Sequence, residues 1–389
     1  MESWSIHSFY AEATKELGDE KAIKLQRYAQ SLMTSNLPVI FTLGHLAKIT
    51  HTDYNYLQDT VRRKREAANY KMFDIKKRSG GRRFIHAVNG RLHDVQQFIN
   101  SELLQKVTPH PASFAFHSSG GIHKCAKEHC EARWLFHFDL KDFFYSVTEM
   151  TVYNIFKKLG YSNLLSFELA RLCTTTRLPK DFKRVLVHRV DSTFLFNLKE
   201  KIDYPHLEKK GIIGVLPQGA PTSPMLANLA AFDLDKDLSE FASQYGFTYT
   251  RYADDITISA SYISPALSIG NIQHHVIRTI RKHRFLENPD KTRIAGPGSR
   301  KKILGLLVDG PIPRLSKETY KRIDRLLHAS QKYGLEETAA HEKFESAYGF
   351  HNHLSGLVAF VKDVDQKRWE EFDKRLKTIK QDSEVKVIE

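Results

Sequence analysis

Two neighbouring aspartates, Asp254 and Asp255, lie within a run of β-forming residues, "YTRYADDITIS" at positions 249–259. Apolar and polar residues alternate on both sides of the pair, and this period of two predicts a β-hairpin with the acidic pair at its tip. Adjacent carboxylates repel each other. The pair is therefore either an ordinary solvated Asp-Asp turn or part of a site whose bound cation relieves the repulsion.

A third aspartate favours the cation site. In "WLFHFDLKDFF" (134–144) a mostly apolar strand runs into Asp139, and a lone carboxylate is costly to bury unless it is paired or binds a cation. Two strand ends that carry carboxylates, placed side by side, would offer the oxygen ligands that Mg²⁺ prefers. We expect Asp139, Asp254 and Asp255 to share two Mg²⁺ ions, with Mn²⁺ able to substitute. Two ions roughly 3.5–4 Å apart suit an in-line phosphoryl displacement such as nucleotidyl transfer.

The composition agrees with a polyanionic partner. The 389 residues include 59 Lys and Arg against 45 Asp and Glu, a formal charge of +14, which favours nucleic acid but does not by itself exclude an anionic membrane surface. No apolar stretch reaches the roughly 20 residues that span a bilayer, and the first residues lack a signal-peptide pattern. We expect a cytoplasmic protein with no membrane partner. The three cysteines are too few for a disulfide framework and are expected to be reduced.

The elements that must position these aspartates can be outlined from periodicity. Residues 1–35 are predicted to be helical. Further amphipathic helices are predicted over 37–50, 54–73 and 90–107. A turn at Gly80-Gly81 and a short strand at 82–88 lie between the last two of these helices. From Trp134 short apolar strands alternate with helical segments at about 147–173 and 223–243, which is typical of a lobe of mixed α and β structure.

Two other segments have a distinct character. A polar, basic stretch at about 174–210 has no clear period and is predicted to be a surface insertion. The tail from Ser316 is predicted to form a small helical unit whose helices carry apolar stripes. The stripes are Tyr320, Ile323 and Leu327, and Trp369, Phe372, Leu376 and Ile379.

Three ordered segments resemble the A, B and C motifs of reverse transcriptases: "HFDLKDFFYSV" (137–147), "GVLPQGAPTSPMLANLAAFDLD" (214–235) and "YTRYADDITIS" (249–259). "NPDKTRI" and "KKILGLLVDG" resemble the D and E segments. "LPVIFTLGHLAKIT", "GPGSRKKILGLLV" and "HLSGLVAFVKDVD" extend the resemblance to bacterial retron reverse transcriptases, over roughly residues 36–380.

The resemblance implies an α+β fold, the right-hand polymerase fold with fingers, an RRM-like antiparallel-sheet palm and a helical thumb. The expected boundaries are an N-terminal helical extension at 1–35, fingers at 36–133, a palm at 134–312 with the basic insertion at about 174–210, and a thumb at 313–389.

It also implies roles for individual residues. Asp139, Asp254 and Asp255 would be the catalytic metal ligands, with the Leu140 carbonyl as a further ligand. Phe144 would stack under the sugar and exclude a 2′-hydroxyl, so that deoxynucleotides are preferred; packing against Phe143 is the alternative. Asp142 and Phe143 fall in the same substrate-binding segment.

The remaining substrate contacts come from three other segments. Gln218 and Gly219 match the loop that supports the template and the incoming nucleotide, where glycine permits a close backbone approach. Arg82 or Arg83 matches the strand that grips the triphosphate, although two arginines after a glycine turn are also common on a solvated edge. Lys291 would donate a proton to pyrophosphate, or be an ordinary surface lysine.

Other residues bear on RNA recognition. Lys321, Arg322 and Arg325 lie about one turn apart on a predicted helix and would bind RNA; a solvated basic face is the alternative. Retron enzymes commonly carry an Asn-Ala-x-x-His and a Val-Thr-Gly motif, whereas the corresponding stretches here are 125–129, "CAKEH", and 303–305, "ILG". These departures put the details of RNA recognition and priming in doubt. The cluster His123, Cys125, His129 and Cys130 lacks zinc-finger spacing and fits a fingers segment better than a zinc site.

The expected function is that of a retron RNA-directed DNA polymerase. By resemblance it copies a cognate structured noncoding RNA from deoxynucleoside triphosphates into a branched or RNA-linked single-stranded DNA, msDNA, and acts with an effector (toxin) protein in antiphage defence. Two alternatives stay open: a non-retron, abortive-infection type of defence reverse transcriptase, and a catalytically silent RNA-binding scaffold. Three converging carboxylates argue against the scaffold.

Overall fold

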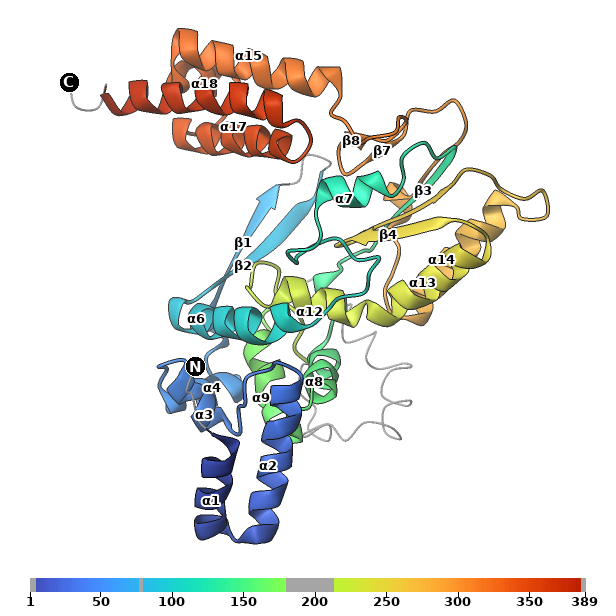
Figure 1. Cartoon of the computed structure of the whole chain (residues 1–389). Coiled ribbons are helices and arrows are strands. Elements are labelled where there is room, and N and C mark those ends of the chain that lie inside the picture. The colour runs from blue at the N-terminus through green and yellow to red at the C-terminus, as the bar shows by residue number, and fades with distance from the viewer. Residues whose placement is uncertain (1–4, 77–79, 180–212, 386–389) are drawn as a thin grey trace.

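The computed structural model of the chain describes residues 5–76, 80–179 and 213–385. Its N-terminal part is helical and leads into a two-stranded antiparallel sheet (Figure 1). The elements are α1 (Ile6–Leu17), α2 (Asp19–Thr34), α3 (Leu43–Ile49), α4 (Tyr54–Val61), α5 (Glu66–Asn69), β1 (Tyr70–Lys76), β2 (Arg82–Val88) and α6 (Gly90–Phe98), the last continuing as η1 (Ile99–Leu103) and η2 (Leu104–Lys106).

Two helix predictions in this part were too long. Of the helix expected at 37–50, only α3 forms. Its first turn is capped by the Thr42 hydroxyl, which accepts a hydrogen bond from the His45 amide. The helix expected at 54–73 is interrupted at Arg63, which has a φ of +61°. It ends at Asn69 because the following residues pair with β2, beginning with Tyr70 opposite Val88.

A four-stranded antiparallel sheet forms the centre of the molecule, with strand order β4-β5-β3-β6. Its strands are β3 (Trp134–Asp139), β4 (Thr248–Tyr252), β5 (Asp255–Ala260) and β6 (Arg293–Ala295). The helices around it are α7 (Ile122–Lys127), α8 (Glu149–Lys158), α9 (Asn163–Cys173), α12 (Ser223–Ala230), α13 (Phe232–Gln244) and α14 (Ile269–Lys282), and two short turns are η3 (Phe144–Ser146) and η4 (Pro289–Lys291). The predicted helical segments at 147–173 and 223–243 are thus each divided in two.

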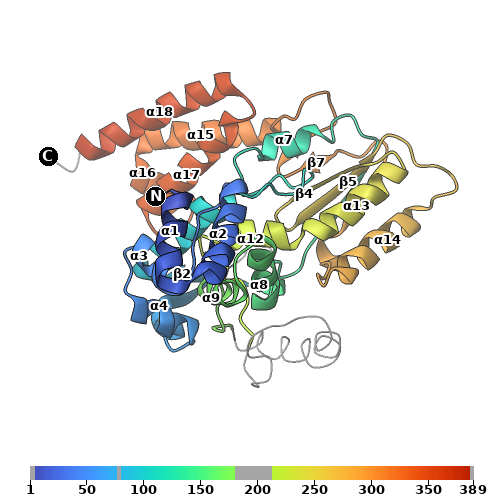
Figure 2. The ribbon, with the colours of Figure 1, turned by 60° about the horizontal axis from the view of Figure 1, so that its bottom comes forward.

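The two faces of this sheet differ. Phe136, Phe138, Ile256 and Ile258 point to one face and are fully buried in the main core with the helices. Figure 2 shows α13 and α14 lying along this side of β4 and β5. Because side chains alternate along a strand, the register that pairs Phe138 with Ile256 places Asp139 and Asp255 together on the opposite face. The acidic residues therefore face away from the helical layer.

The C-terminal residues form a separate helical bundle, seen in orange and red in Figure 1. A small hairpin, β7 (Lys302–Ile303) and β8 (Leu306–Leu307), precedes the bundle, whose helices are α15 (Lys317–Tyr333), α16 (Leu335–His341), α17 (Ala347–Lys362) and α18 (Gln366–Val385). The predicted stripes are confirmed: Ile323, Leu327, Phe372 and Ile379 are buried in a second core cluster, with Tyr320, Trp369 and Leu376 packed against it. None of the described helices is both long and apolar enough to cross a membrane. Most of the predicted basic insertion, 180–210, lies outside the described residues.

Candidate active site

Three aspartates meet where β3 ends and the β4–β5 hairpin turns. Asp139 and Asp255 are direct partners across the antiparallel register. The Leu140 amide donates a hydrogen bond to the Asp254 carbonyl at 2.8 Å, which ties the end of β3 to the turn. The hairpin with the acidic pair at its tip, predicted from the alternating pattern, is confirmed.

Asp139 is buried and bound by groups from the segment before β6. Asn288 donates from Nδ2 to Asp139 Oδ1 at 3.1 Å, and Lys291 donates from Nζ to Oδ2 at 2.7 Å. The Lys291 side chain is 51% exposed, whereas that of Asp139 is 5% exposed. Lys291 is therefore part of the acidic cluster and not an isolated surface lysine.

The charges of the cluster act on one another. Burial raises the pKa of Asp254 to about 6, and the negative charges of Asp255 and Asp139 add to this effect. Burial alone would lower the pKa of Lys291, but the hydrogen bond and charge of Asp139 raise it. Asp255 also lies 3.3 Å from the ring of His137. A cluster with this surplus of negative charge is a place where a cation is stabilised.

The donor set fits a hard divalent ion, since three carboxylates and a main-chain carbonyl are the oxygen ligands that Mg²⁺ takes. In the described part of the chain, no three His, Cys, Asp or Glu side chains already stand in the geometry of a metal site. Here the ammonium of Lys291 contacts the Asp139 carboxylate. Binding of an ion thus requires the side chains to turn toward it.

An ion pair lies beneath the turn on the helical face of the sheet. Arg251 and Asp235 are both fully buried, and the guanidinium binds the two carboxylate oxygens at 2.7 and 2.6 Å. Arg251 also donates to the Ala253 carbonyl at 2.9 Å and to Asn228 Oδ1 at 3.0 Å. Because Ala253 immediately precedes the acidic pair, with a φ of +57°, Arg251 holds the backbone that presents both carboxylates.

His129 hydrogen-bonds to both strands of the hairpin on the face of the sheet opposite the Arg251–Asp235 pair. Its Nδ1 lies 2.7 Å from Ser259 Oγ on β5, and its Nε2 lies 2.7 Å from Thr250 Oγ1 on β4. Burial lowers the pKa of His129 to about 3, so the ring is neutral. Cys125 Sγ is 3.3 Å from the same Thr250 hydroxyl. In the "HKCAKEHC" cluster these two side chains therefore bond to the sheet.

The loop expected to support the template is fixed to β2. The His86 amide donates to the Gln218 carbonyl at 2.8 Å. Gly219 has a φ of +116°, and a Cβ there would lie 2.9 Å from the His86 carbonyl oxygen and 3.1 Å from Ile85 Cγ2. Gly219 therefore approaches the backbone of β2 closely, whereas its role toward a template or nucleotide stays a prediction.

The other predicted substrate contacts are placed as follows. Phe143 is buried, and its ring packs 5.6 Å from that of Phe285. Phe144 is partly buried, with its ring 5.7 Å from Phe143 and 6.2 Å from Phe116. Asp142 has a φ of +53° at the start of the short turn η3. Arg82 lies 3.3 Å from Asp74 across the β1–β2 hairpin, and Arg83 is exposed on the same strand.

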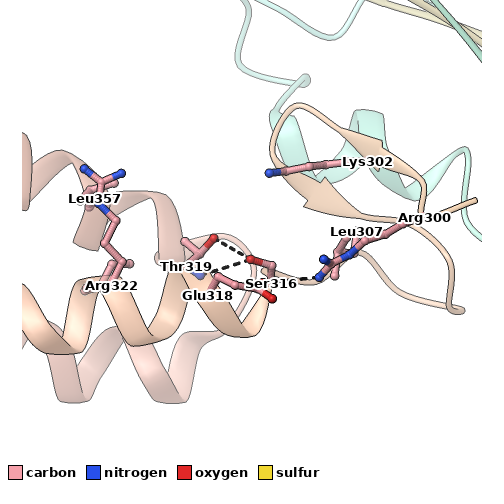
Figure 3. A pocket seen from close by; sticks show the side chains of 9 residues that line it. Arg300, Lys302, Leu307, Ser316, Glu318, Thr319, Arg322 and Leu357 are labelled. Atoms are coloured by element: carbon pink, nitrogen blue, oxygen red, sulfur yellow. Dashed lines mark hydrogen bonds and ion pairs between the residues drawn. The ribbon is translucent and has the colours of Figure 1, made fainter. Parts of the chain in front are cut away.

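The basic residues predicted on the first tail helix are exposed on α15. Arg322 lies 3.2 Å from the ring of His353, and Arg325 forms an ion pair with Glu342 at 3.2 Å. Arg322 also lines a cavity of about 500 Å³ between the start of α15 and the β7–β8 hairpin, which Arg300 and Lys302 line from the other side (Figure 3). Lys321 is exposed on the same helix. The basic surface therefore includes Arg300 and Lys302 as well as the residues predicted on α15.

Sequence reasoning missed the residues that support the aspartates. Arg251 follows Phe247 and Tyr249 in the alternating pattern before the acidic pair, which could have marked it as a charge on the buried side of the strand. Asn288 is the first residue of the predicted D segment, "NPDKTRI", but nothing local indicated its contact with Asp139.

Comparisons with known proteins identify the family of the chain. Residues 75–308 match the family model described as "Reverse transcriptase (RNA-dependent DNA polymerase)". Retron Mx65 reverse transcriptase of Myxococcus xanthus is 32% identical over 91% of this chain and 74% of its own length. Retron Ec86 reverse transcriptase of Escherichia coli is 27% identical over 86% of this chain and 88% of its own length.

Among solved structures, a telomerase from Candida albicans in complex with a fragment of telomeric RNA is 12% identical, with a TM-score of 0.42, covering 84% of this chain and 59% of that chain. The assignment depends on the family model and the sequence relatives. The chain belongs to the reverse transcriptases, to their bacterial retron type, and is an RNA-directed DNA polymerase.

Proposed function

We propose that this enzyme copies a cognate structured noncoding RNA into a single-stranded DNA that stays linked to the RNA, with Asp139, Asp254 and Asp255 as its catalytic carboxylates. One observation carries the proposal. The register places Asp139 opposite Asp255, and the Leu140 amide donates to the Asp254 carbonyl, so the backbones of the three aspartates lie side by side at the ends of separate strands.

These carboxylates and the Leu140 carbonyl would hold two Mg²⁺ ions, or Mn²⁺, which when bound would activate the attacking hydroxyl and neutralise charge on the leaving pyrophosphate. Side chains of the protein would donate the proton and hold the acidic hairpin in place. Lys291 offsets the charge of Asp139 and is protonated at neutral pH, so it can give a proton to pyrophosphate. Arg251 and His129 keep the hairpin in place from its two faces.

The substrate contacts proposed from the resemblance agree with the fold. Gln218 and Gly219 would support the template and the incoming nucleotide, because their loop is hydrogen-bonded to β2. Arg82 or Arg83 on that strand would bind the triphosphate, and Arg82 would have to leave its exposed contact with Asp74. Phe144 would exclude a 2′-hydroxyl, with Asp142 and Phe143 shaping the turn beneath it.

We assign the lobes of a right-hand polymerase to the chain as fingers at 36–133, an RRM-like palm at 134–312 and a thumb at 313–389, after an extension at 1–35. The antiparallel β4-β5-β3-β6 sheet supports the palm, and the second core cluster, to which most of the C-terminal helices contribute, supports the thumb; this cluster also includes Leu135 of β3. The extension packs on the fingers, since the Tyr28 hydroxyl donates to the Ile40 carbonyl at 2.6 Å and the Phe9 ring stacks on that of Phe41 at 5.1 Å.

RNA would bind the thumb through Lys321, Arg322 and Arg325, with Arg300 and Lys302 extending the basic surface (Figure 3). The formal charge of +14 supports this partner. The RNA-linked DNA would act with an effector protein in antiphage defence. An abortive-infection type of reverse transcriptase remains the second candidate, and a structured RNA encoded beside the gene would favour the retron.

The test is DNA synthesis by the purified protein on the RNA that copurifies with it, with Mg²⁺ and deoxynucleoside triphosphates. Asp254→Asn and Asp255→Asn should abolish synthesis and leave RNA binding within about twofold, because only the metal ligands change. Asp233→Asn, an exposed aspartate on α13, is the matched control. Undiminished synthesis in both active-site variants would refute the mechanism, and a wild-type protein that binds RNA but never synthesises DNA would indicate a scaffold.

A further inference from the structure

A loop at 113–121 lies against the free edge of β4, next to the acidic turn. Ser113 forms a parallel bridge with Arg251, and the Phe114 amide donates to the Arg251 carbonyl at 2.9 Å. The loop folds back on itself at Gly120, where a Cβ would lie 2.1 Å from the Phe114 carbonyl oxygen. These contacts fix the loop to the strand that leads into the active site.

Phe116 is held out at the tip of this loop. Its φ is +68°, a value that bulky residues seldom adopt, and 36% of the residue is exposed. Gln105 Nε2 donates to the Phe116 carbonyl at 3.0 Å, and the His117 ring bonds to the Ser113 carbonyl and to the Ser119 hydroxyl. Such backbone strain persists only where the surroundings impose it, and it gathers at binding and catalytic sites. A ligand explains this exposed ring better than packing does.

A cavity of about 310 Å³ lies between Phe116 and Tyr252. Its lining is aromatic, hydroxyl, amide and glycine together with the imidazole of His117, and among the described residues that line it there is no Asp, Glu, Lys or Arg. On one side the Phe116 ring is 6.2 Å from that of Phe144, and on the other Tyr252 is two residues before Asp254. The cavity therefore suits a flat, neutral group beside the active site, and not a phosphate.

We propose that this cavity, the base pocket, binds an unpaired RNA base at the point where the new DNA strand begins, with the base stacked on Phe116. The proposal rests on the polymerase function proposed above and adds a binding site to it. Unpaired bases are recognised by stacking on aromatic rings and by hydrogen bonds to their edges. The incoming nucleotide is excluded as the occupant because its base pairs with the template during synthesis.

The first measurement is binding of a short single-stranded RNA that carries one 2-aminopurine, whose fluorescence falls when it stacks. Phe116→Ala should bind this RNA about tenfold more weakly, the loss typical of one stacking contact, and should lose the quenching. Phe116→Trp should retain both, and Phe116→Leu, apolar but not aromatic, should behave like the alanine variant. Tyr262→Ala removes another exposed aromatic residue outside the pocket and is the control.

The second measurement is extension of oligo(dT) paired with poly(rA), in which no base is unpaired at the start. Here Phe116→Ala should stay within about twofold of wild type with an unchanged KM for dTTP. Wild-type affinity and quenching in Phe116→Ala would overturn the proposal, as would a raised KM for dTTP or an equal loss in both assays by a folded variant. A wild-type protein inactive on the paired substrate would refute the polymerase mechanism, while the fluorescence measurement would still report on the pocket.

Discussion

Lys291 Nζ lies 2.7 Å from Asp139 Oδ2, so an amine contacts one of the three carboxylates of the proposed active site. The contact joins the end of β3 to the segment before β6, and Asn288 holds the other oxygen of the same carboxylate. The proposed function gives Lys291 two roles to separate: competition with a metal ion for Asp139, and donation of a proton to the leaving pyrophosphate.

Lys291→Ala should separate the two proposed roles of this lysine. We expect kcat to fall about 100-fold with little change in the KM for deoxynucleotides, because a proton donor acts in the chemical step. The Mg²⁺ concentration for half-maximal activity should fall as well, since no ammonium competes for Asp139. Steady-state kinetics over a Mg²⁺ titration measures both. Lys236→Ala, an exposed lysine on α13, is the control, and an unchanged kcat would remove the proton-donor role.

The buried pair of Arg251 and Asp235 gives a second prediction. Asp235→Asn leaves the guanidinium without its charged partner and should lower the free energy of unfolding by about 3 kcal/mol, measured by denaturant titration. Glu20→Gln breaks the exposed pair with Lys24 and should leave the unfolding midpoint unchanged.

The double variant Arg251→Met with Asp235→Leu distinguishes stability from positioning. Apolar replacement of both partners should recover much of the lost stability. Activity should stay low, because the Ala253 carbonyl then has no donor to hold the acidic turn. Full activity in a stable double variant would show that the pair serves stability alone.

The contrast between these residues explains how far the sequence could lead. The hairpin at Asp254 and Asp255 and the stripes of the C-terminal helices follow from local periodicity, and both are confirmed. The pairing of Arg251 with Asp235 does not follow from local periodicity, since it depends on the packing of β4 against α13. For the same reason the helix predicted to Phe73 ends at Asn69: pairing with β2, a contact distant in sequence, overrides the local pattern. The roles assigned to the aspartates stay predictions until their variants are measured.

Gly219 provides a third prediction. Gly219→Ala should detach the loop from β2, because the new Cβ would lie 2.9 Å from the His86 carbonyl oxygen in a backbone conformation that already disfavours alanine. We expect the KM for deoxynucleotides to rise severalfold. Gly298→Ala has a similar φ, +82°, but open space around its Cβ, and it should affect stability slightly and the KM not at all. Equal effects of the two changes would show that backbone strain, and not the close approach, is responsible.

Phe144 gives a prediction about sugar selection. Its ring packs on Phe143 and Phe116 but is only partly buried, so one side is available to a nucleotide. Removing the ring in Phe144→Ala should make room for a 2′-hydroxyl and raise incorporation of ribonucleotides relative to deoxynucleotides by roughly tenfold or more. Competition between dTTP and UTP on poly(rA) measures the ratio. Equal rejection of UTP before and after the change would assign Phe144 to packing.

His129 makes the stability of the fold depend on pH. Its pKa is lowered to about 3 in the folded protein, whereas an unfolded histidine takes up a proton near pH 6.5. Below pH 6.5 the unfolded state therefore binds more protons, and the folded state loses stability as the pH falls toward 3, by up to about 1.4 kcal/mol per pH unit from this one group. His129→Gln can still bond to both hydroxyls but does not titrate, so its denaturation midpoint should change less between pH 7 and pH 5 than that of wild type. His328→Gln, at an exposed position on α15, should keep the wild-type slope; if His129→Gln keeps it too, the ring is not neutral and buried in solution.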